Sequence, residues 1–537
     1  MIKTIEKHPV LSLLLFIILM FGFTIDAIPV SIMEGRNFIS AREMLTDNNW
    51  ILTTINGEPR YQKPPLPTWI TAVFGYMFGI KNVLALRLPA LLMIAVTGIT
   101  TYFLSLQLTH DKIQSLISGF LVMTSFYVIG ITIEGPWDIY AHGFILVALY
   151  QLLILLENKC IQLVKGLVII AFIGASVLSK GPVSLYVLLL SFCIAYGFSF
   201  KYMSKYKFLY LKAFLLLIAG IGIGAIWYLY VRQADPEAFN KITSKETSNW
   251  SSYNVRPFYY YWSFFIQSGI WVIFAFVSLL YPYLKSKIIH KKAYKFTFLW
   301  TITGVILLSL IPEKKSRYLM PVLIPLAINM GFYVNYLIKE FKNLTSKKEI
   351  FPVYLQFGLI AVIAILYPFS GFILKPYLSG IVLVRFLIAS VLMITIGYLI
   401  LKHLKTKHIK NSFYLTLTFM LCVGIFIIPL VKLQKQSDYK GLESFNPSNT
   451  ALYSINTLAP EVIYNYGKKI PSLGTSEDFI IPSDTTFYLL TSKSTLENSY
   501  LKSLNSQFIG KYDLNTAEKD KRGYKNRLVN YLFKISK

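Results

Sequence analysis

Residues 56–69 read NGEPRYQKPPLPTW, and apolar runs lie on both sides of this stretch. Prolines fix φ and lack a backbone N–H, so this segment cannot continue a transmembrane helix. The Asn-Gly pair at its start is a turn signal, because both residues tolerate positive φ. The stretch therefore predicts a rigid loop that presents Arg60, Tyr61 and Lys63 near the lipid headgroups.

The composition is that of a membrane protein. Of the 537 residues, 55% are hydrophobic and 15% charged, and the mean hydropathy is +0.54. A soluble domain carries about a quarter charged residues. Apolar runs of about 20 residues, the length that crosses a hydrocarbon core, recur along the chain. The three cysteines offer neither a disulfide framework nor metal-ligand spacing. We therefore expect an all-α polytopic membrane protein.

Hydropathy predicts thirteen transmembrane helices. Their approximate ranges are 10–28, 84–108, 115–133, 137–156, 163–179, 182–199, 208–231, 260–284, 295–311, 318–338, 352–373, 380–401 and 411–432. The first apolar run is long and no small-residue cleavage site follows it, so we interpret it as an uncleaved anchor.

The placement of lysine and arginine predicts the topology. The strongly basic loops all lie on one side if the N-terminus is cytoplasmic, as the positive-inside rule requires. These loops are 201–207, 285–295, 339–348 and 402–410. An odd number of spans then places the C-terminus in the periplasm. The net charge of +27 is therefore largely a topology signal, and we expect no nucleic-acid partner.

Two domains are expected, 1–434 in the membrane and 435–537 outside it. The membrane domain includes a first periplasmic loop at 29–83. The tail alternates short strand patterns with one helical pattern, which indicates a small accessory α/β domain. The expected strands are 449–455 and 485–492, and the expected helix is 459–470.

The first periplasmic loop contains a helical pattern at 33–45, MEGRNFISAREML. Phe38, Ala41 and Leu45 are spaced at i, i+3 and i+7, which predicts an amphipathic helix lying on the membrane surface. Its polar residues would then face an aqueous cavity: Glu34, Arg36, Asn37 and Arg42. A second short apolar helix is expected at 69–80.

The order of these motifs resembles the first outer loop of the GT-C glycosyltransferases, in particular the aminoarabinose-transferase and protein-mannosyltransferase group. The resemblance runs from the 33–45 helix through YQKPPLP to ALRLPA, which opens the next span. Three later stretches fall where that family has similar ones: LSKGPVSL (178–185), RPFYYYW (256–262) and SRYLMPVLIPLA (316–327). The resemblance covers roughly residues 10–340.

The resemblance implies a reaction at the periplasmic face of the bacterial inner membrane. A hexosyl or pentosyl group would arrive on a polyprenyl-phosphate-sugar donor, held among membrane lipids. An acceptor oxygen would attack the anomeric carbon with inversion, and polyprenyl phosphate would leave. The acceptor would be a lipid, such as lipid A, or a protein.

This chemistry requires a carboxylate near the acceptor. Glu34 matches the second position of the family's Asp-Glu pair, but Met33 stands where the family has its leading Asp. Either Glu34 or Asp26, at the end of the first span, would take over that role. Asp138 lies just inside the fourth span, where the family also carries an acidic residue, and His142 could pair with it at i, i+4.

Cations are required where negative charge grows on the leaving phosphate. Lys63 matches the family's phosphate-contacting lysine, and Lys180 precedes a Gly-Pro start of the sixth span that offers backbone N–H groups to an anion. Arg317 lies in an otherwise cation-poor set of outer loops. The full set of expected donor contacts is Arg36, Arg60, Tyr61, Lys63, Lys180, Arg256, Arg317 and Tyr318. Lys314 and Lys315 are weaker candidates, and Arg87 is expected to tie the loop to the second span.

Cofactors and rival functions stay open at this point. The sequence shows no recognisable cluster of metal ligands, so no metal site is predicted, although Asp and Glu side chains could ligate a divalent cation. A transporter or lipid flippase would place ionisable residues near the bilayer midplane, whereas here the charges gather at the outer rim. A membrane assembly subunit without catalysis is the other alternative.

Overall fold

The computed structural model describes residues 2–22, 24–134, 136–159, 162–433, 438–445, 450–475, 480–493 and 505–537. The chain divides into two compact units. Unit 1 comprises Met1–Asp26, Tyr61–Pro67 and Arg87–Pro429, and unit 2 comprises Ala27–Arg60, Thr68–Leu86 and Leu430–Lys537. The predicted boundary between domains, 434/435, lies outside the described residues.

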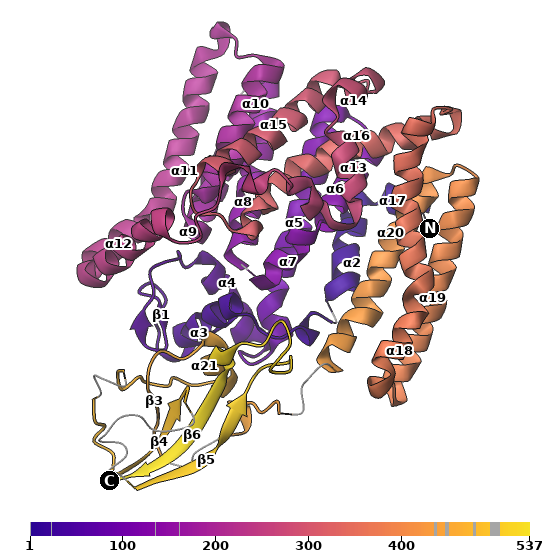
Figure 1. Cartoon of the computed structure of the whole chain (residues 1–537). Helices are drawn as coiled ribbons and strands as arrows, with labels where there is room; N and C mark the ends of the chain where they lie inside the picture. Colours follow the sequence, from indigo (N-terminus) through magenta and orange to yellow (C-terminus); the bar gives the residue numbers. More distant parts are fainter. Residues whose placement is uncertain are drawn as a thin grey trace. The chain divides into compact units, whose positions relative to one another are not determined.

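Unit 1 is helical throughout its described part (Figure 1). Its helices, with α5 beginning in unit 2, are α1 (Ile2–Lys7), α2 (Pro9–Phe21), α5 (Val83–Thr109), α6 (Lys112–Met123), α7 (Phe126–Glu134), α8 (Pro136–Asn158), α9 (Leu163–Lys180), α10 (Ser191–Phe200), α11 (Lys207–Ala234), α12 (Pro236–Ser252), α13 (Val272–Ser278), α14 (Tyr281–Lys287), α15 (Lys291–Leu310), α16 (Leu323–Glu340), α17 (Lys347–Leu366), α18 (Gly371–Leu374), α19 (Gly380–Lys405) and α20 (Ile409–Cys422). The most extensive helix pairings are α8 with α9 and α9 with α11.

Within the described residues, eleven helices are long and apolar enough to cross a membrane, so the expected polytopic all-α architecture is confirmed. They are Pro9–Ala27, Val83–Thr109, Trp137–Asn158, Leu163–Lys180, Ser204–Ala234, Phe258–Ser278, Lys291–Leu310, Ser316–Asn343, Lys347–Tyr377, Gly380–Lys405 and Ile409–Leu430. Two of the thirteen predicted spans, 115–133 and 182–199, do not form continuous α-helices of that length.

The two interruptions differ in form. The 115–133 segment breaks after Met123, where Thr124 Oγ1 donates to the Phe120 carbonyl at 2.7 Å and Ser125 Oγ donates to Leu121 at 2.8 Å. Hydroxyls that bond backward in this way compete with the helical ladder. In 182–199, a π-helical turn, η2 (Leu185–Leu190), precedes α10. Hydropathy does not register either interruption.

Unit 2 has a four-stranded mixed sheet in the order β3-β4-β6-β5 (Figure 1). The strands are β3 (Leu452–Ser454), β4 (Thr486–Thr491), β5 (Asn505–Asp513) and β6 (Val529–Ser536). The β3–β4 pair is parallel and the other two pairs are antiparallel. With α21 (Pro460–Tyr466), this confirms the expected small α/β fold of the tail.

The first loop supplies the remaining elements of unit 2. They are α3 (Ile32–Thr46), β1 (Thr54–Ile55), β2 (Glu58–Pro59) and most of α4 (Leu66–Phe78). Asn56 and Gly57 have φ of 57° and 85°, so they form the predicted turn between β1 and β2. The Glu43 carboxylate accepts from the backbone N–H of both turn residues, at 2.7 and 3.2 Å, and thereby orders the hairpin.

The expectation that α3 lies amphipathically on a membrane surface is wrong. The helix is buried on nearly all sides, and Ile39 belongs to the same core cluster as Val462 of α21. Gly35 permits this approach, because a Cβ there would lie 3.2 Å from the Pro460 carbonyl carbon. The polar Asn37 is also buried, accepting from Thr68 and donating to Thr71. Helix α3 is therefore a core element of unit 2.

Candidate functional site

Asp138 and Lys180 form a buried ion pair in unit 1. Asp138 lies in the first turn of α8 and is only 3% exposed, while Lys180 is the last residue of α9. The packing of these two helices brings the ammonium group onto Asp138 Oδ1. Lys180 thus ends α9 and directly precedes the turn at 181–182 that leads into the next helical segment. A buried charge pair of this kind requires close contact to offset the loss of hydration.

His142 extends this pair by one helical turn. Its Nε2 lies 3.8 Å from Asp138 Oδ1, which confirms the expected i, i+4 pairing. On the other side of the ring, Nδ1 lies 2.9 Å from Ser184 Oγ. Because His142 and Ser184 are both buried, the His142 imidazole is fixed between Ser184 and Asp138.

A short helical turn, η6 (Ser316–Val322), brings further cations to the same pair. The Lys180 ammonium lies 4.8 Å from the centroid of the Tyr318 ring, and the Lys315 ammonium lies 5.7 Å from it. Arg317 is half-buried and close enough to Asp138 and Lys180 to interact electrostatically with both. Tyr318 is therefore flanked by two ammonium groups.

Two aromatic residues hold the segment before η6 in place. The Tyr261 hydroxyl accepts from Lys315 N and donates to Lys315 O, both at 3.0 Å. The Lys315 side chain forms a 2.5 Å ion pair with Glu313. Tyr260 Oη lies 2.9 Å from Ser316 Oγ. These contacts fix the backbone from which Arg317 and Tyr318 project.

Lys63 comes to this group from the proline-rich arm. It is half-buried, and its charge interacts with those of Lys180, Lys315 and Asp138. Burial, reinforced by the neighbouring Lys180 ammonium, lowers the pKa of Lys63 to about 8. We call Lys63, Asp138, Lys180, Lys315, Arg317 and Tyr318 the charge cluster.

The arm that carries Lys63 is tied to the start of α12. The Tyr61 hydroxyl donates to Asp235 Oδ2 at 2.8 Å, and the Tyr61 ring makes an edge contact with Trp227. Asp235 also caps α12 by accepting from Ala238 N. Tyr61 is thus placed beside the cluster in a positioning role.

Arg256 and Lys314 lie in two segments that pair with each other. The Arg256 backbone pairs with Pro312, and its side chain is exposed. Lys314 is buried and donates to the carbonyls of Arg256 and Ile311. Burial lowers the pKa of Lys314.

Asp26 lies in the turn η1 (Ile25–Ala27) and is half-buried. Arg87 holds this turn, because its Nη1 donates to the Ile25 carbonyl at 2.5 Å. This bond joins the second span to the end of the first span, whereas the expected tie was to the first loop.

The other three predicted site residues belong to unit 2. Glu34 is fully buried and completes a capping box, in which its Oε2 accepts from Ser31 N at 3.0 Å. Arg60 donates to the Arg36 carbonyl and to Ser40 Oγ, and its burial lowers its pKa to about 9. Arg36 itself is exposed. These contacts give Glu34 and Arg60 clear structural roles.

The comparisons with known proteins agree with the geometry. Residues 62–227 match the family described as dolichyl-phosphate-mannose-protein mannosyltransferase. The structure resembles that of ArnT from Cupriavidus metallidurans bound to undecaprenyl phosphate, with a TM-score of 0.69 and 13% sequence identity, over 99% of this chain and 97% of that one. The chain has the GT-C glycosyltransferase fold. The predicted resemblance to the aminoarabinose-transferase and protein-mannosyltransferase group is thereby confirmed.

Curated relatives match a shorter stretch of this chain, at higher sequence identity. An uncharacterized protein of Aquifex aeolicus is 27% identical over 312 residues, which cover 57% of this chain and 60% of that protein. The undecaprenyl phosphate-alpha-4-amino-4-deoxy-L-arabinose arabinosyl transferase of Erwinia tasmaniensis is 22% identical over 307 residues, 56% of this chain and 54% of that protein. The chain thus spans little more than half the length of the curated relatives it matches.

Sequence reasoning underrated or missed some residues at and around the charge cluster. The Lys315 ammonium lies 5.7 Å from the centroid of the Tyr318 ring and forms an ion pair with Glu313. Glu246 of α12 interacts electrostatically with Lys63, and Ser184 holds His142. The two cations beside Arg317 in PEKKSRY were the available signal for Lys315, whereas nothing in the sequence marks Glu246. No group of three potential metal ligands occurs among the described His, Cys, Asp and Glu residues.

Proposed function

We propose that this chain is an integral-membrane glycosyltransferase of the bacterial inner membrane. It would transfer a hexosyl or pentosyl group from a polyprenyl-phosphate donor to a lipid A-like lipid or a protein at the periplasmic face. One observation carries the proposal: Lys63, Lys180, Arg317 and Tyr318, each expected at the donor phosphate, meet around Asp138 in unit 1. The names of the Erwinia and Cupriavidus proteins support undecaprenyl phosphate as the carrier.

In the proposed reaction, an acceptor oxygen attacks the anomeric carbon from the face opposite the phosphate. The new carbon–oxygen bond forms as the bond to the phosphate oxygen breaks, and the bonding electrons leave with polyprenyl phosphate. The configuration at the anomeric carbon is inverted. Negative charge grows on the departing phosphate, so fixed cations there lower the barrier.

The lysines of the charge cluster differ in whether a carboxylate already balances their charge. Lys180 is neutralised by Asp138, and Lys315 by Glu313. Lys63 has no ion pair within the described part of the chain, so its charge is available to the phosphate. We therefore assign the main phosphate contact to Lys63, with Asp138 positioning Lys180. Arg317, whose charge interacts with those of Asp138 and Lys180, is the second cation that we expect at the phosphate.

Tyr318 offers a hydroxyl between the two neutralised lysines, suited to a phosphate oxygen or a sugar hydroxyl. A phosphate acceptor, as in lipid A modification, is already ionised and needs little help from a base. On the acceptor side, Asp26 and Glu34 remain our candidates for orienting the acceptor or taking its proton.

The test is a deletion strain examined by mass spectrometry of lipid A, surface glycolipids and periplasmic proteins. We expect one of these classes to lose a sugar, and the wild-type gene to restore it. A gene encoding Lys63→Ala together with Arg317→Ala should fail to restore it although the protein accumulates normally in the membrane. An unchanged profile in all three classes would overturn the proposal.

A further inference from the structure

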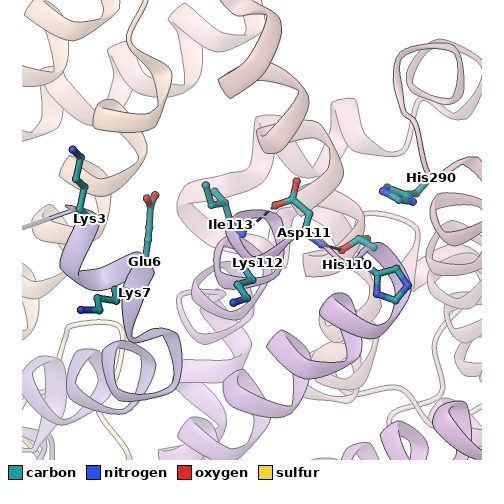
Figure 2. A pocket seen from close by; sticks show the side chains of 9 residues that line it. Lys3, Glu6, Lys7, His110, Asp111, Lys112, Ile113 and His290 are labelled. Atoms are coloured by element: carbon teal, nitrogen blue, oxygen red, sulfur yellow. Dashed lines mark hydrogen bonds between the residues drawn. The ribbon is translucent and has the colours of Figure 1, made fainter.

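An open hollow of about 810 Å³ lies in unit 1, remote in sequence from the charge cluster. It is lined by α1, the turn that precedes α6 and the turn that precedes α15 (Figure 2). Three lysines and two histidines supply its basic groups: Lys3, Lys7, His110, Lys112 and His290. These groups come from three separate parts of the chain, and the hollow brings them together.

The two carboxylates in the hollow are already neutralised from outside it. Glu6 forms a 2.6 Å ion pair with Lys410, and Asp111 forms a 2.9 Å ion pair with Lys339. Burial alone would raise the pKa of Asp111, but the backbone hydrogen bond from Gln114 and the Lys339 ion pair hold it below its usual value. These partners therefore keep the Asp111 carboxylate ionised. The three lysines of the hollow make no ion pair within the described residues, so the hollow carries an uncompensated positive charge.

An apolar stripe begins one helical turn beyond Lys7. Leu11, Leu15 and Leu19 of α2 follow at successive i+4 positions and are 52%, 45% and 44% exposed. Backbone hydrogen bonds of the helical type continue across the junction between α1 and α2. Positive charge is therefore followed directly by an exposed apolar surface. A free phosphate ion would use only the first of these features, whereas a phospholipid would use both.

We propose that this hollow binds the phosphate headgroup of an anionic phospholipid, with an acyl chain lying along the Leu11–Leu15–Leu19 stripe. The predicted topology places the N-terminus and the 285–295 loop, which contains His290, on the cytoplasmic side. The lipid therefore belongs to the cytoplasmic leaflet, whose anionic headgroups attract clustered lysines next to a transmembrane helix. This site is independent of the donor site proposed above.

The test uses the full-length protein, purified in detergent and supplied with phosphatidylglycerol or phosphatidylcholine, with bound lipid counted by native mass spectrometry. The site variant combines Lys3→Gln, Lys7→Gln and Lys112→Gln. The matched control combines Lys201→Gln, Lys205→Gln and Lys207→Gln, which removes the same charge from exposed lysines of another predicted cytoplasmic loop. We expect wild type and control to retain one phosphatidylglycerol, and the site variant to bind it at least about tenfold more weakly.

A second variant, Lys112→Gln with His290→Gln, keeps the N-terminal charges that guide membrane insertion and should also bind phosphatidylglycerol more weakly. Millimolar inorganic phosphate should not displace the lipid, because it gains nothing from the apolar stripe. Equal loss in the site variant and the control would overturn the proposal, as would equal retention of phosphatidylcholine. Displacement by inorganic phosphate would show an anion site without lipid specificity and would overturn it too.

Discussion

The lysines of the charge cluster differ in how their charge is balanced. Lys180 and Lys315 each contact a carboxylate, so their charge is matched before any substrate binds. Lys63 lies among other cations, and its burial and the neighbouring Lys180 bring its pKa to about 8. Its ammonium group is charged below that pH and loses its charge above it. Lys63 is thus the residue whose protonation is most sensitive near neutral pH.

Lys63 predicts a pH dependence. Affinity for undecaprenyl phosphate should fall as the pH rises from about 7 through about 8, because the neutral amine no longer attracts the phosphate. Lys63→Arg should remove this decline, since a guanidinium stays charged. Titrations of both proteins with undecaprenyl phosphate across this pH range provide the check, with Lys201→Arg as the control. A decline of the same midpoint in Lys63→Arg would exclude Lys63 as its source.

Glu34 allows its charge to be separated from its structural role. Glutamine also serves at the third position of a capping box, so Glu34→Gln keeps the hydrogen bonds with Ser31 and removes only the charge. If capping is the role of Glu34, this variant should keep its sugar-transfer rate to within about twofold, whereas Glu34→Ala should lower stability by about 0.5–2 kcal/mol. Transfer assays and thermal unfolding together distinguish the two. A large loss of rate in a stable Glu34→Gln protein would assign the carboxylate to the chemistry.

Among the elements, α3 shows what spacing alone can and cannot predict. Its existence and approximate bounds follow from the sequence, because the helical spacing at 33–45 is a local feature. Its burial does not follow, because its partners are remote in sequence: Asn37 bonds with Thr68 and Thr71, and Arg42 donates to the Ile463 carbonyl. The polar residues of α3 therefore suggested a solvent-exposed face, whereas in the structure they form buried hydrogen bonds.

Asn37→Ala tests this buried role of α3. The change removes the buried hydrogen bonds of Asn37 with Thr68 and Thr71 and should lower the stability of the protein by about 1–3 kcal/mol. Arg36→Ala, on the exposed side of the same helix, is the matched control and should change stability by less than about 0.5 kcal/mol. Thermal unfolding of the purified variants provides the comparison. Similar stability for both variants would contradict a buried role for Asn37.

At the scale of the whole chain, hydropathy predicted the helical architecture, because span length and apolar composition are read from contiguous residues. Two of the thirteen predicted spans are built from shorter helical pieces, which hydropathy does not register. The pairing of Asp138 with His142 was accessible because it is local on one helix. The meeting of Lys63, Lys180 and Arg317 depends on tertiary packing, and the sequence indicated it only through the order of family motifs.

The most direct test of the account is a double-mutant cycle for binding of undecaprenyl phosphate, using Lys63→Gln, Arg317→Gln and the combined variant. Each single change removes a charge-assisted contact and should weaken binding roughly 10- to 100-fold. Because both cations act on one phosphate, the combined loss should differ from the product of the single losses by more than about twofold. Binding that stays within about twofold of wild type in all three variants would contradict the account.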